Sequence, residues 1–105
     1  MSFVEQNTRS SFIQLKTRYP EYIPAIIIGD KDIDPLIVKK KYLMPKDINF
    51  GIVMTNIRKN IKLKSADALI FMIDNKIITP NIMVRELEKN DFVYINICKE
   101  SVFGL

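Results

Sequence analysis

The sequence contains no histidine and a single cysteine, Cys98, and these two shortages exclude much enzyme chemistry. Without histidine the chain cannot form a Ser-His-Asp or Cys-His nucleophile system, and it lacks the ligands for a Cys/His zinc site. One cysteine cannot form an internal disulfide, so nothing in the chain requires an oxidising compartment. Because no histidine can activate Cys98, we expect a passive role for it. We therefore predict a protein that is not an enzyme and has no metal site or cofactor.

Long apolar segments are missing too. Apolar runs such as residues 23–28 are far shorter than the ~20 residues of a membrane-spanning helix. The first residues lack the basic and apolar regions of a signal peptide. Any attachment to a membrane is therefore expected to come from a modification or a partner.

The chain has 105 residues, enough for one small domain, and carries 16 basic against 12 acidic side chains. This excess of positive charge is mild. It suits an acidic partner, a membrane surface or a nucleic acid, and it does not choose among them.

The residue pattern predicts alternating helices and strands. Ser10 and Ser11 can cap a short helix with Phe12 and Leu15 on its apolar face, and Asn49 can cap a longer one. The predicted elements are a helix after residue 10, strands at 23–28 and 41–44, a helix at 50–61, a strand at 69–73, a short helix after 79–80, and a strand at 92–97. Residues 1–9 are expected to form a loose arm or a frayed turn, 10–98 the domain, and 99–105 a flexible tail. One amphipathic helix on a small mixed sheet is the economical arrangement for these elements, which places the chain in the α+β class.

Six segments resemble the GABARAP-type ubiquitin-like modifiers of autophagy in their order and spacing. They are residues 19–24, 40–48 (KKYLMPKDI), 57–61 (IRKNI), 68–71 (ALIF), 91–95 (DFVYI) and 100–105 (ESVFGL). The resemblance covers about residues 12–105 and implies a ubiquitin-like β-grasp fold. That fold is expected to be a mixed four-stranded sheet packed on a central helix, with a short N-terminal helix.

The resemblance gives the C-terminal segment a chemical role. It implies that a processing cysteine protease cleaves between Gly104 and Leu105, and that ubiquitin-like activating and conjugating enzymes then carry the glycine as a thioester. Glycine has no Cβ, so its backbone can pass close to the walls of such enzymes. The final step joins Gly104 to phosphatidylethanolamine. The resemblance therefore implies a monomer that is cytoplasmic at first and is bound to the autophagosomal membrane after lipidation.

The strand at 41–44 is followed by Pro45, which suggests a sheet edge open to an extended peptide. Partners of the family carry an aromatic residue and, three positions later, an aliphatic one. The resemblance places the aromatic anchor among Leu15, Pro24, Ile26, Lys41, Leu43 and Phe92. It places the aliphatic anchor among Tyr42, Met44, Pro45, Ile48 and Val53. Ile26 and Leu43 could equally be plain core residues.

Lys39, Lys40 and Arg58 are interpreted as a basic rim that attracts the acidic flanks of such peptides. Runs of lysine are more often simply solvated, and a nucleic-acid footprint is a third interpretation. We predict no nucleic-acid partner, because no aromatic residues that could stack on bases are interleaved with the basic residues.

Several positions depart from the family pattern. Ser11 replaces a common acid, Tyr22 a common base, Asn56 a leucine of the aliphatic pocket and Asn60 a frequent arginine. The second pocket is therefore expected to be more polar. Three other hypotheses stay open: a soluble peptide-binding adaptor that is never lipidated, a modifier joined to a protein lysine, and a small nucleic-acid binder.

Overall fold

The computed structural model describes residues 3–64 and 67–100. In this part of the chain the elements are α1 (Phe3–Arg18), β1 (Tyr22–Gly29), the 3-10 turn η1 (Asp34–Leu36), β2 (Lys41–Pro45), α2 (Phe50–Lys59), β3 (Leu69–Ile73), β4 (Lys76–Ile77), the 3-10 turn η2 (Val84–Leu87) and β5 (Val93–Lys99).

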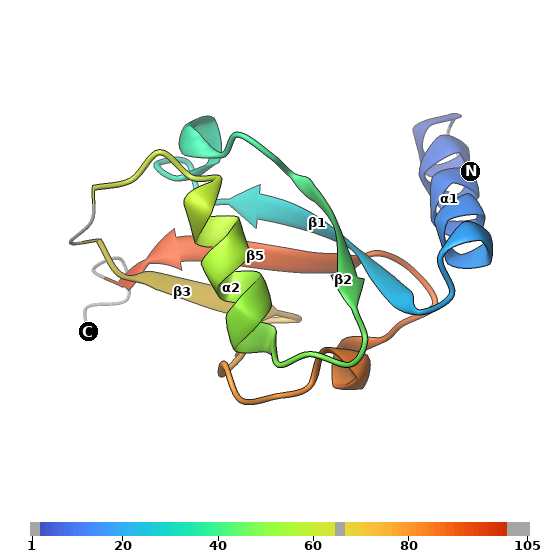
Figure 1. Ribbon diagram of the computed structural model, residues 1–105. Coiled ribbons are helices and arrows are strands. Elements are labelled where there is room, and N and C mark those ends of the chain that lie inside the picture. The colour runs from blue at the N-terminus through green and yellow to red at the C-terminus, as the bar shows by residue number, and fades with distance from the viewer. Residues whose placement is uncertain (1–2, 65–66, 101–105) are drawn as a thin grey trace.

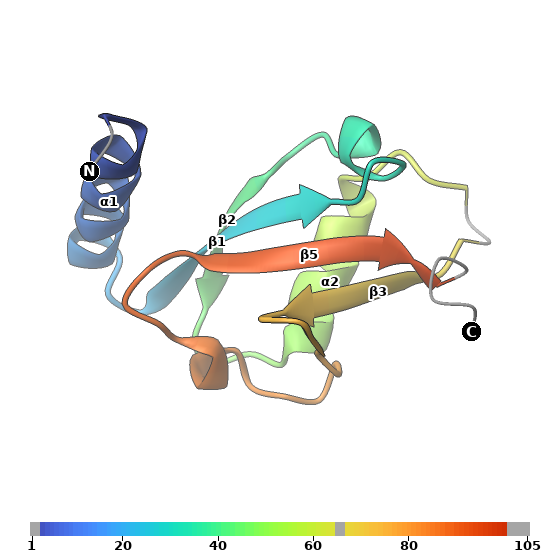
Figure 2. The same ribbon diagram turned by 180° about the vertical axis from the view of Figure 1, so that it is seen from behind.

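One mixed sheet organises the molecule, with the strand order β2-β1-β5-β3-β4. The central strands β1 and β5 are parallel, and the other neighbouring pairs are antiparallel. Helix α2 crosses one face of the sheet, while α1 stands at the end where β1 begins (Figures 1 and 2). The expected α+β class, with a sheet packed on a central helix, is confirmed.

The sheet has five strands where four were predicted. The additional strand β4 follows a two-residue turn in which Asp74 and Asn75 both have positive φ, at 52° and 64°. Such a turn reverses the chain directly into an antiparallel partner. Because β4 has only two residues, it leaves almost no periodic signal in the sequence.

The core lies between α2 and the sheet, as the spacing of apolar residues predicted. Phe50, Val53 and Ile57 are the buried residues of α2, and they repeat at the helical period. The most deeply enclosed strand residues of this core are Ile23, Ala25, Ile27, Met44, Val93, Ile95 and Ile97. Their alternation along β1 and β5 leaves the intervening side chains on the opposite face of the sheet.

Helix α1 begins at Phe3 and not at Ser10, so the loose arm predicted for residues 1–9 is wrong from Phe3 onward. Ser10 and Ser11 lie within the helix with exposed side chains. No glycine or proline interrupts residues 3–18, and the helix ends before Pro20.

Three other boundaries differ from the sequence prediction. Helix α2 ends at Lys59, and Ile61 instead forms an antiparallel bridge with Ile37. The short helix expected after Pro80 is the later turn η2, whose start is held by a hydrogen bond from the Met83 amide to the Glu86 carboxylate. Strand β5 ends at Lys99, which was predicted to be the first residue of the tail.

Candidate functional site

Strand β2 forms an open edge of the sheet, as predicted from Pro45. The Ile27 amide donates to the Lys40 carbonyl at 2.7 Å, which makes residues 27 and 40 a hydrogen-bonded pair. In an antiparallel ladder such pairs alternate with pairs whose main-chain groups point away. The register Pro24↔Leu43 and Ile26↔Lys41 therefore turns the main-chain groups of Lys41 and Leu43 toward the open edge.

A hollow of about 400 Å³ lies beside this edge, between β2, α1 and the loop before β5. Four of the six residues predicted for the aromatic anchor line it: Leu15, Lys41, Leu43 and Phe92. The other two, Pro24 and Ile26, are not part of this lining. Pro24 is almost fully buried and lies opposite Leu43 on the neighbouring strand. A residue of α1, two residues of β2 and one residue of the loop before β5 thus meet at one apolar hollow.

Helix α1 forms the far wall of the hollow and is held there at two points. The ring of Phe12 packs edge-on against that of Phe92, with centroids 5.6 Å apart. The Lys16 ammonium pairs with the Glu88 carboxylate, which also accepts from the Lys46 ammonium at 3.0 Å. Hydrogen bonds from Lys16 and then Lys46 lower the pKa of Glu88. These contacts tie the helix to the loop before β5.

A second hollow of about 890 Å³ continues along α1 and shares Leu15, Lys41 and Phe92 with the first. Its remaining lining residues come from successive turns of the helix: Ser11, Ile13, Gln14, Thr17 and Arg18. The two linings together carry three cations, Arg18, Lys39 and Lys41, and no carboxylate. This composition favours a partner with acidic side chains.

The residues predicted for the aliphatic anchor divide into two groups. Met44 and Val53 are enclosed in the core, with exposed fractions of 1% and 4%, and neither is available as a pocket wall in this conformation. Tyr42, Pro45 and Ile48 are half-buried. The surface part of that prediction is therefore limited to these three residues, because β2 turns Met44 toward α2.

Tyr42 has an unusual environment on the same strand. Its hydroxyl is buried and has no hydrogen-bond partner within the described residues. Burial raises the pKa of Tyr42, and the nearby Asn60 side chain opposes that rise. The Lys39 ammonium lies 4.7 Å from the centre of the tyrosine ring, in a cation–π geometry. This contact holds the lysine at the two adjoining hollows beside β2 and α1, which together we call the groove.

The basic rim is only partly free. The Lys40 ammonium pairs with Asp34 at 2.8 Å, and this bond together with one from the Gly29 amide lowers the pKa of Asp34. Arg58 is half-buried near the end of α2. Of the three predicted rim residues, Lys39 is the one that the structure brings into the lining of the hollow.

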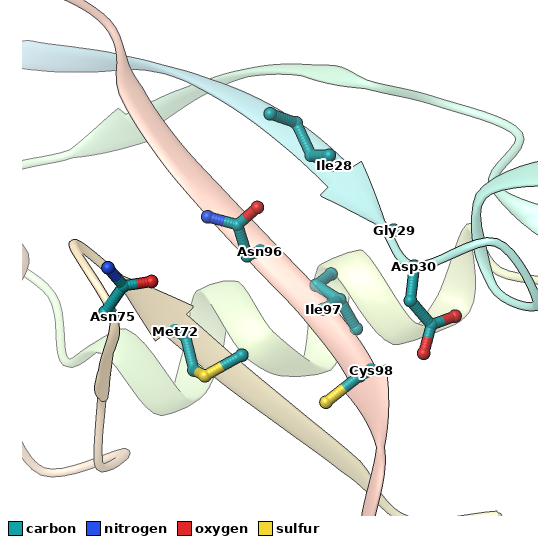
Figure 3. Close-up of a pocket in the computed structure, with 8 residues that line it drawn as sticks. All are labelled: Ile28, Gly29, Asp30, Met72, Asn75, Asn96, Ile97 and Cys98. Atoms are coloured by element: carbon teal, nitrogen blue, oxygen red, sulfur yellow. The ribbon is translucent and has the colours of Figure 1, made fainter. Parts of the chain in front are cut away.

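A third hollow, of about 270 Å³, lies over β1, β5 and β3 on the face away from α2 (Figure 3). Ile28, Met72 and Asn96 line it, and Cys98 lies at one end. Burial, and to a smaller extent the charge of Asp30, raises the pKa of the Cys98 thiol. A protonated, enclosed thiol is a poor nucleophile. Within residues 3–64 and 67–100 no cluster of histidine, cysteine and acidic side chains could hold a metal ion.

Gly104 and Leu105, the predicted conjugation and cleavage positions, lie outside the described residues. In the part of the chain that is described, no helix combines the length and apolar character needed to cross a bilayer.

Comparison with known proteins connects this chain and its fold to a family. A family model described as the autophagy protein Atg8, ubiquitin-like, matches residues 7–104. The chain belongs to the Atg8 family. Autophagy-related protein 8e of Arabidopsis thaliana is 32% identical to it over 97 residues, which cover 87% of this chain and 80% of that protein. The family resemblance of the sequence is confirmed, and this Atg8-family chain is a ubiquitin-like protein of autophagy.

Solved structures agree on the fold. The crystal structure of Trypanosoma brucei ATG8 superposes with a TM-score of 0.74 at 18% identity, covering 90% of this chain and 87% of the other. Plasmodium falciparum Atg8, solved in complex with a Plasmodium falciparum Atg3 peptide, also gives a TM-score of 0.74 at 18% identity, with coverage of 88% and 87%. The ubiquitin-like fold predicted from sequence is therefore confirmed.

Sequence reasoning missed the contribution of α1 beyond Leu15. Ser11, Leu15 and Arg18 are spaced at i, i+4 and i+7, so they share one face of a helix. That spacing could have identified the helix as the wall of the groove. The position of Lys39 over Tyr42 had no such signal, because it depends on the path of the loop before β2.

Proposed function

We propose that this Atg8-family protein is conjugated through Gly104 to phosphatidylethanolamine and then binds receptors on the autophagosomal membrane. The receptors present an extended segment with an aromatic residue and, three positions later, an aliphatic one. The protein itself performs no catalysis. It acts as a membrane-bound adaptor that moves between the cytoplasm and the membrane.

The observation that carries the docking function is the open edge of β2 beside an apolar hollow. The main-chain groups of Lys41 and Leu43 are available to an added strand, while Leu15, Leu43 and Phe92 offer an apolar seat for a side chain. Main-chain hydrogen bonds contribute affinity regardless of the peptide sequence, whereas the apolar hollow gives specificity for the aromatic side chain. The relative from Plasmodium falciparum has been solved with a bound Atg3 peptide, which supports a peptide-binding role in the family.

Charge gives the groove a preference among apolar peptides. Arg18, Lys39 and Lys41 line it without a carboxylate, so acidic residues beside the aromatic anchor are favoured and basic residues are repelled. Exposed charges of this kind act mainly on the association rate and lose influence as salt is added.

Lipid conjugation gives the adaptor its location. Removal of Leu105 by a cysteine protease exposes the Gly104 carboxylate, which activating and conjugating enzymes pass to the lipid amine. Each buried methylene of an acyl chain contributes ~0.8 kcal/mol, so the two chains of phosphatidylethanolamine hold the protein at the bilayer firmly. The conjugating enzyme is the partner class for which the Atg3 peptide complex of the relative provides support.

Amide hydrogen exchange tests the docking geometry residue by residue. On addition of a peptide with the aromatic-x-x-aliphatic pattern and acidic flanks, exchange at Lys41 and Leu43 should slow markedly. Tyr42 and Met44 already face β1 and should change little. A basic-flanked peptide of the same core sequence is the control. Equal protection of all four amides, or of none, would contradict strand addition at this edge.

A further inference from the structure

A second basic surface lies away from the groove, where two segments pair beyond the end of α2. The Val38 amide donates to the Asn60 carbonyl at 2.7 Å, and the Lys62 amide donates to the Leu36 carbonyl at 2.9 Å. These bonds flank the bridge between Ile37 and Ile61. They hold the loop before β2 and the segment after α2 side by side.

The side chains of this region alternate between core and solvent. Ile61 is buried and Leu63 packs against the core, so Lys62 and Lys64 project together on the exposed side. Lys59 is also exposed near the end of α2, and Val38 has an exposed fraction of 65%. We call Val38, Lys59, Lys62 and Lys64 the cationic surface. Neighbouring carboxylates are engaged by other lysines: Asp34 pairs with Lys40, and Asp67 lies 3.8 Å from Lys99.

Glu100, the last described residue, lies beside the segment that follows α2. The Glu100 amide donates to the Ala68 carbonyl at 3.0 Å, and the Asp67 amide donates to the Lys64 carbonyl at 3.1 Å. Figure 1 shows the end of β5 and the loop after α2 at this one end of the molecule. Gly104 follows Glu100 by four residues, so an extended chain can separate them by at most about 14 Å.

We propose that the cationic surface binds the anionic phospholipid headgroups of the membrane to which the protein is attached. This proposal takes the attachment at Gly104 from the proposed function. A bilayer attached at Gly104 is held near this end of the domain, because the extended chain from Glu100 to Gly104 spans at most about 14 Å. Charges act over ~8–10 Å at physiological salt, so headgroups that approach this end can attract its lysines. The three lysines supply attraction to acidic headgroups, and Val38 supplies an apolar side chain that can enter the interface. An acidic protein is the less favoured partner, because conjugation of Gly104 to a lipid would hold a membrane, and not a protein, near this surface.

Sedimentation of the full, unconjugated chain with vesicles tests the surface independently of Gly104. Vesicles of phosphatidylcholine alone are compared with vesicles that also contain phosphatidylserine. We expect binding to the mixed vesicles only, and a decrease with added salt. Neutralising one lysine near a membrane should weaken partitioning about fivefold, so Lys62→Gln/Lys64→Gln should weaken it roughly 25-fold.

The matched control is Lys76→Gln/Lys89→Gln, which removes the same net charge at the opposite end of the sheet. Lys76 belongs to β4, and Lys89 pairs with Asp74 beside it. This control should bind the mixed vesicles within about twofold of wild type. Equal losses for the two double variants would show a net-charge effect and overturn the proposal, as would absence of binding to the mixed vesicles. Tight binding of poly-glutamate with no vesicle binding would assign the surface to an acidic protein instead.

The two proposals fail in different ways. Loss of the cationic-surface interaction leaves peptide docking at β2 and conjugation at Gly104 untouched, because neither Lys62 nor Lys64 lines the groove. Failure of conjugation leaves the vesicle result of the unconjugated chain unchanged.

Discussion

Neighbouring residues of β2 should have separable effects when they are truncated. Leu43 lines the hollow at the open edge, whereas Met44 points into the core with an exposed fraction of 1%. Leu43→Ala should therefore weaken peptide binding, and Met44→Ala should weaken the fold. The two variants remove comparable apolar volume from adjacent positions, so each is the control for the other.

The structure sets the size of both effects. Leu43→Ala removes about three carbon atoms, which at ~0.8 kcal/mol for each buried group gives an upper limit of about 2.4 kcal/mol. Part of this side chain is already buried in the free protein, so we expect a loss of ~1–2 kcal/mol, or roughly 5- to 30-fold in Kd. Met44→Ala leaves a cavity in the core and should lower the free energy of unfolding by ~2–5 kcal/mol.

Calorimetric titration with an acidic-flanked aromatic-x-x-aliphatic peptide measures the first effect, and urea unfolding measures the second. The folded fraction of Met44→Ala should bind with an affinity close to that of wild type. An unchanged Kd for Leu43→Ala would move the docking site away from this hollow. Equal losses of affinity in both variants would show that the two side chains act as one unit, contrary to their opposite directions.

Three further predictions concern the rest of the domain. Because Lys16 is the chief cause of the lowered pKa of Glu88, the pair stabilises the fold above the ordinary glutamate pKa of 4.5 and loses this effect as the pH falls further. At pH 7 the free energy of unfolding of wild type should exceed that of Glu88→Gln by at most about 1 kcal/mol, since the carboxylate is 39% exposed. The thermal melting temperatures of the two proteins should converge as the pH is lowered, and a constant difference would contradict the pairing. Iodoacetamide should modify Cys98 far more slowly in the native protein than in urea, because the thiol is buried and its pKa is raised; equal rates would show an accessible thiol. Gly29→Ala should lower the free energy of unfolding by ~1–3 kcal/mol, because its Cβ would lie 2.6 Å from the Asp34 nitrogen; an unchanged urea midpoint would refute this contact.

Periodic apolar patterns made the core predictable. Phe50, Val53 and Ile57 share one face of α2, and the alternation along β1 and β5 separates core from outer-face residues. Pro45, the last residue of β2, correctly indicated a sheet edge. These features depend on local sequence, which is why they could be inferred without coordinates.

The differences arise where local sequence carries little information. Strand β4 exists because two residues adopt positive φ, and two residues cannot show an alternation. The path of the loop before β2 places Lys39 over Tyr42, which no spacing rule anticipates. Side chains alternate between the two faces of a strand, so Leu43 and Met44 must point in opposite directions. The prediction of the aliphatic pocket included Met44 without using this alternation.

The intact mass of the protein from its own cells, compared between soluble and membrane fractions, tests the central proposal most directly. We predict that the membrane form lacks Leu105 and carries the added mass of phosphatidylethanolamine on Gly104, and that Gly104→Ala abolishes this form. A single full-length species that keeps Leu105 in every fraction, including under starvation, would contradict conjugation. The groove at β2 would then belong to a soluble adaptor.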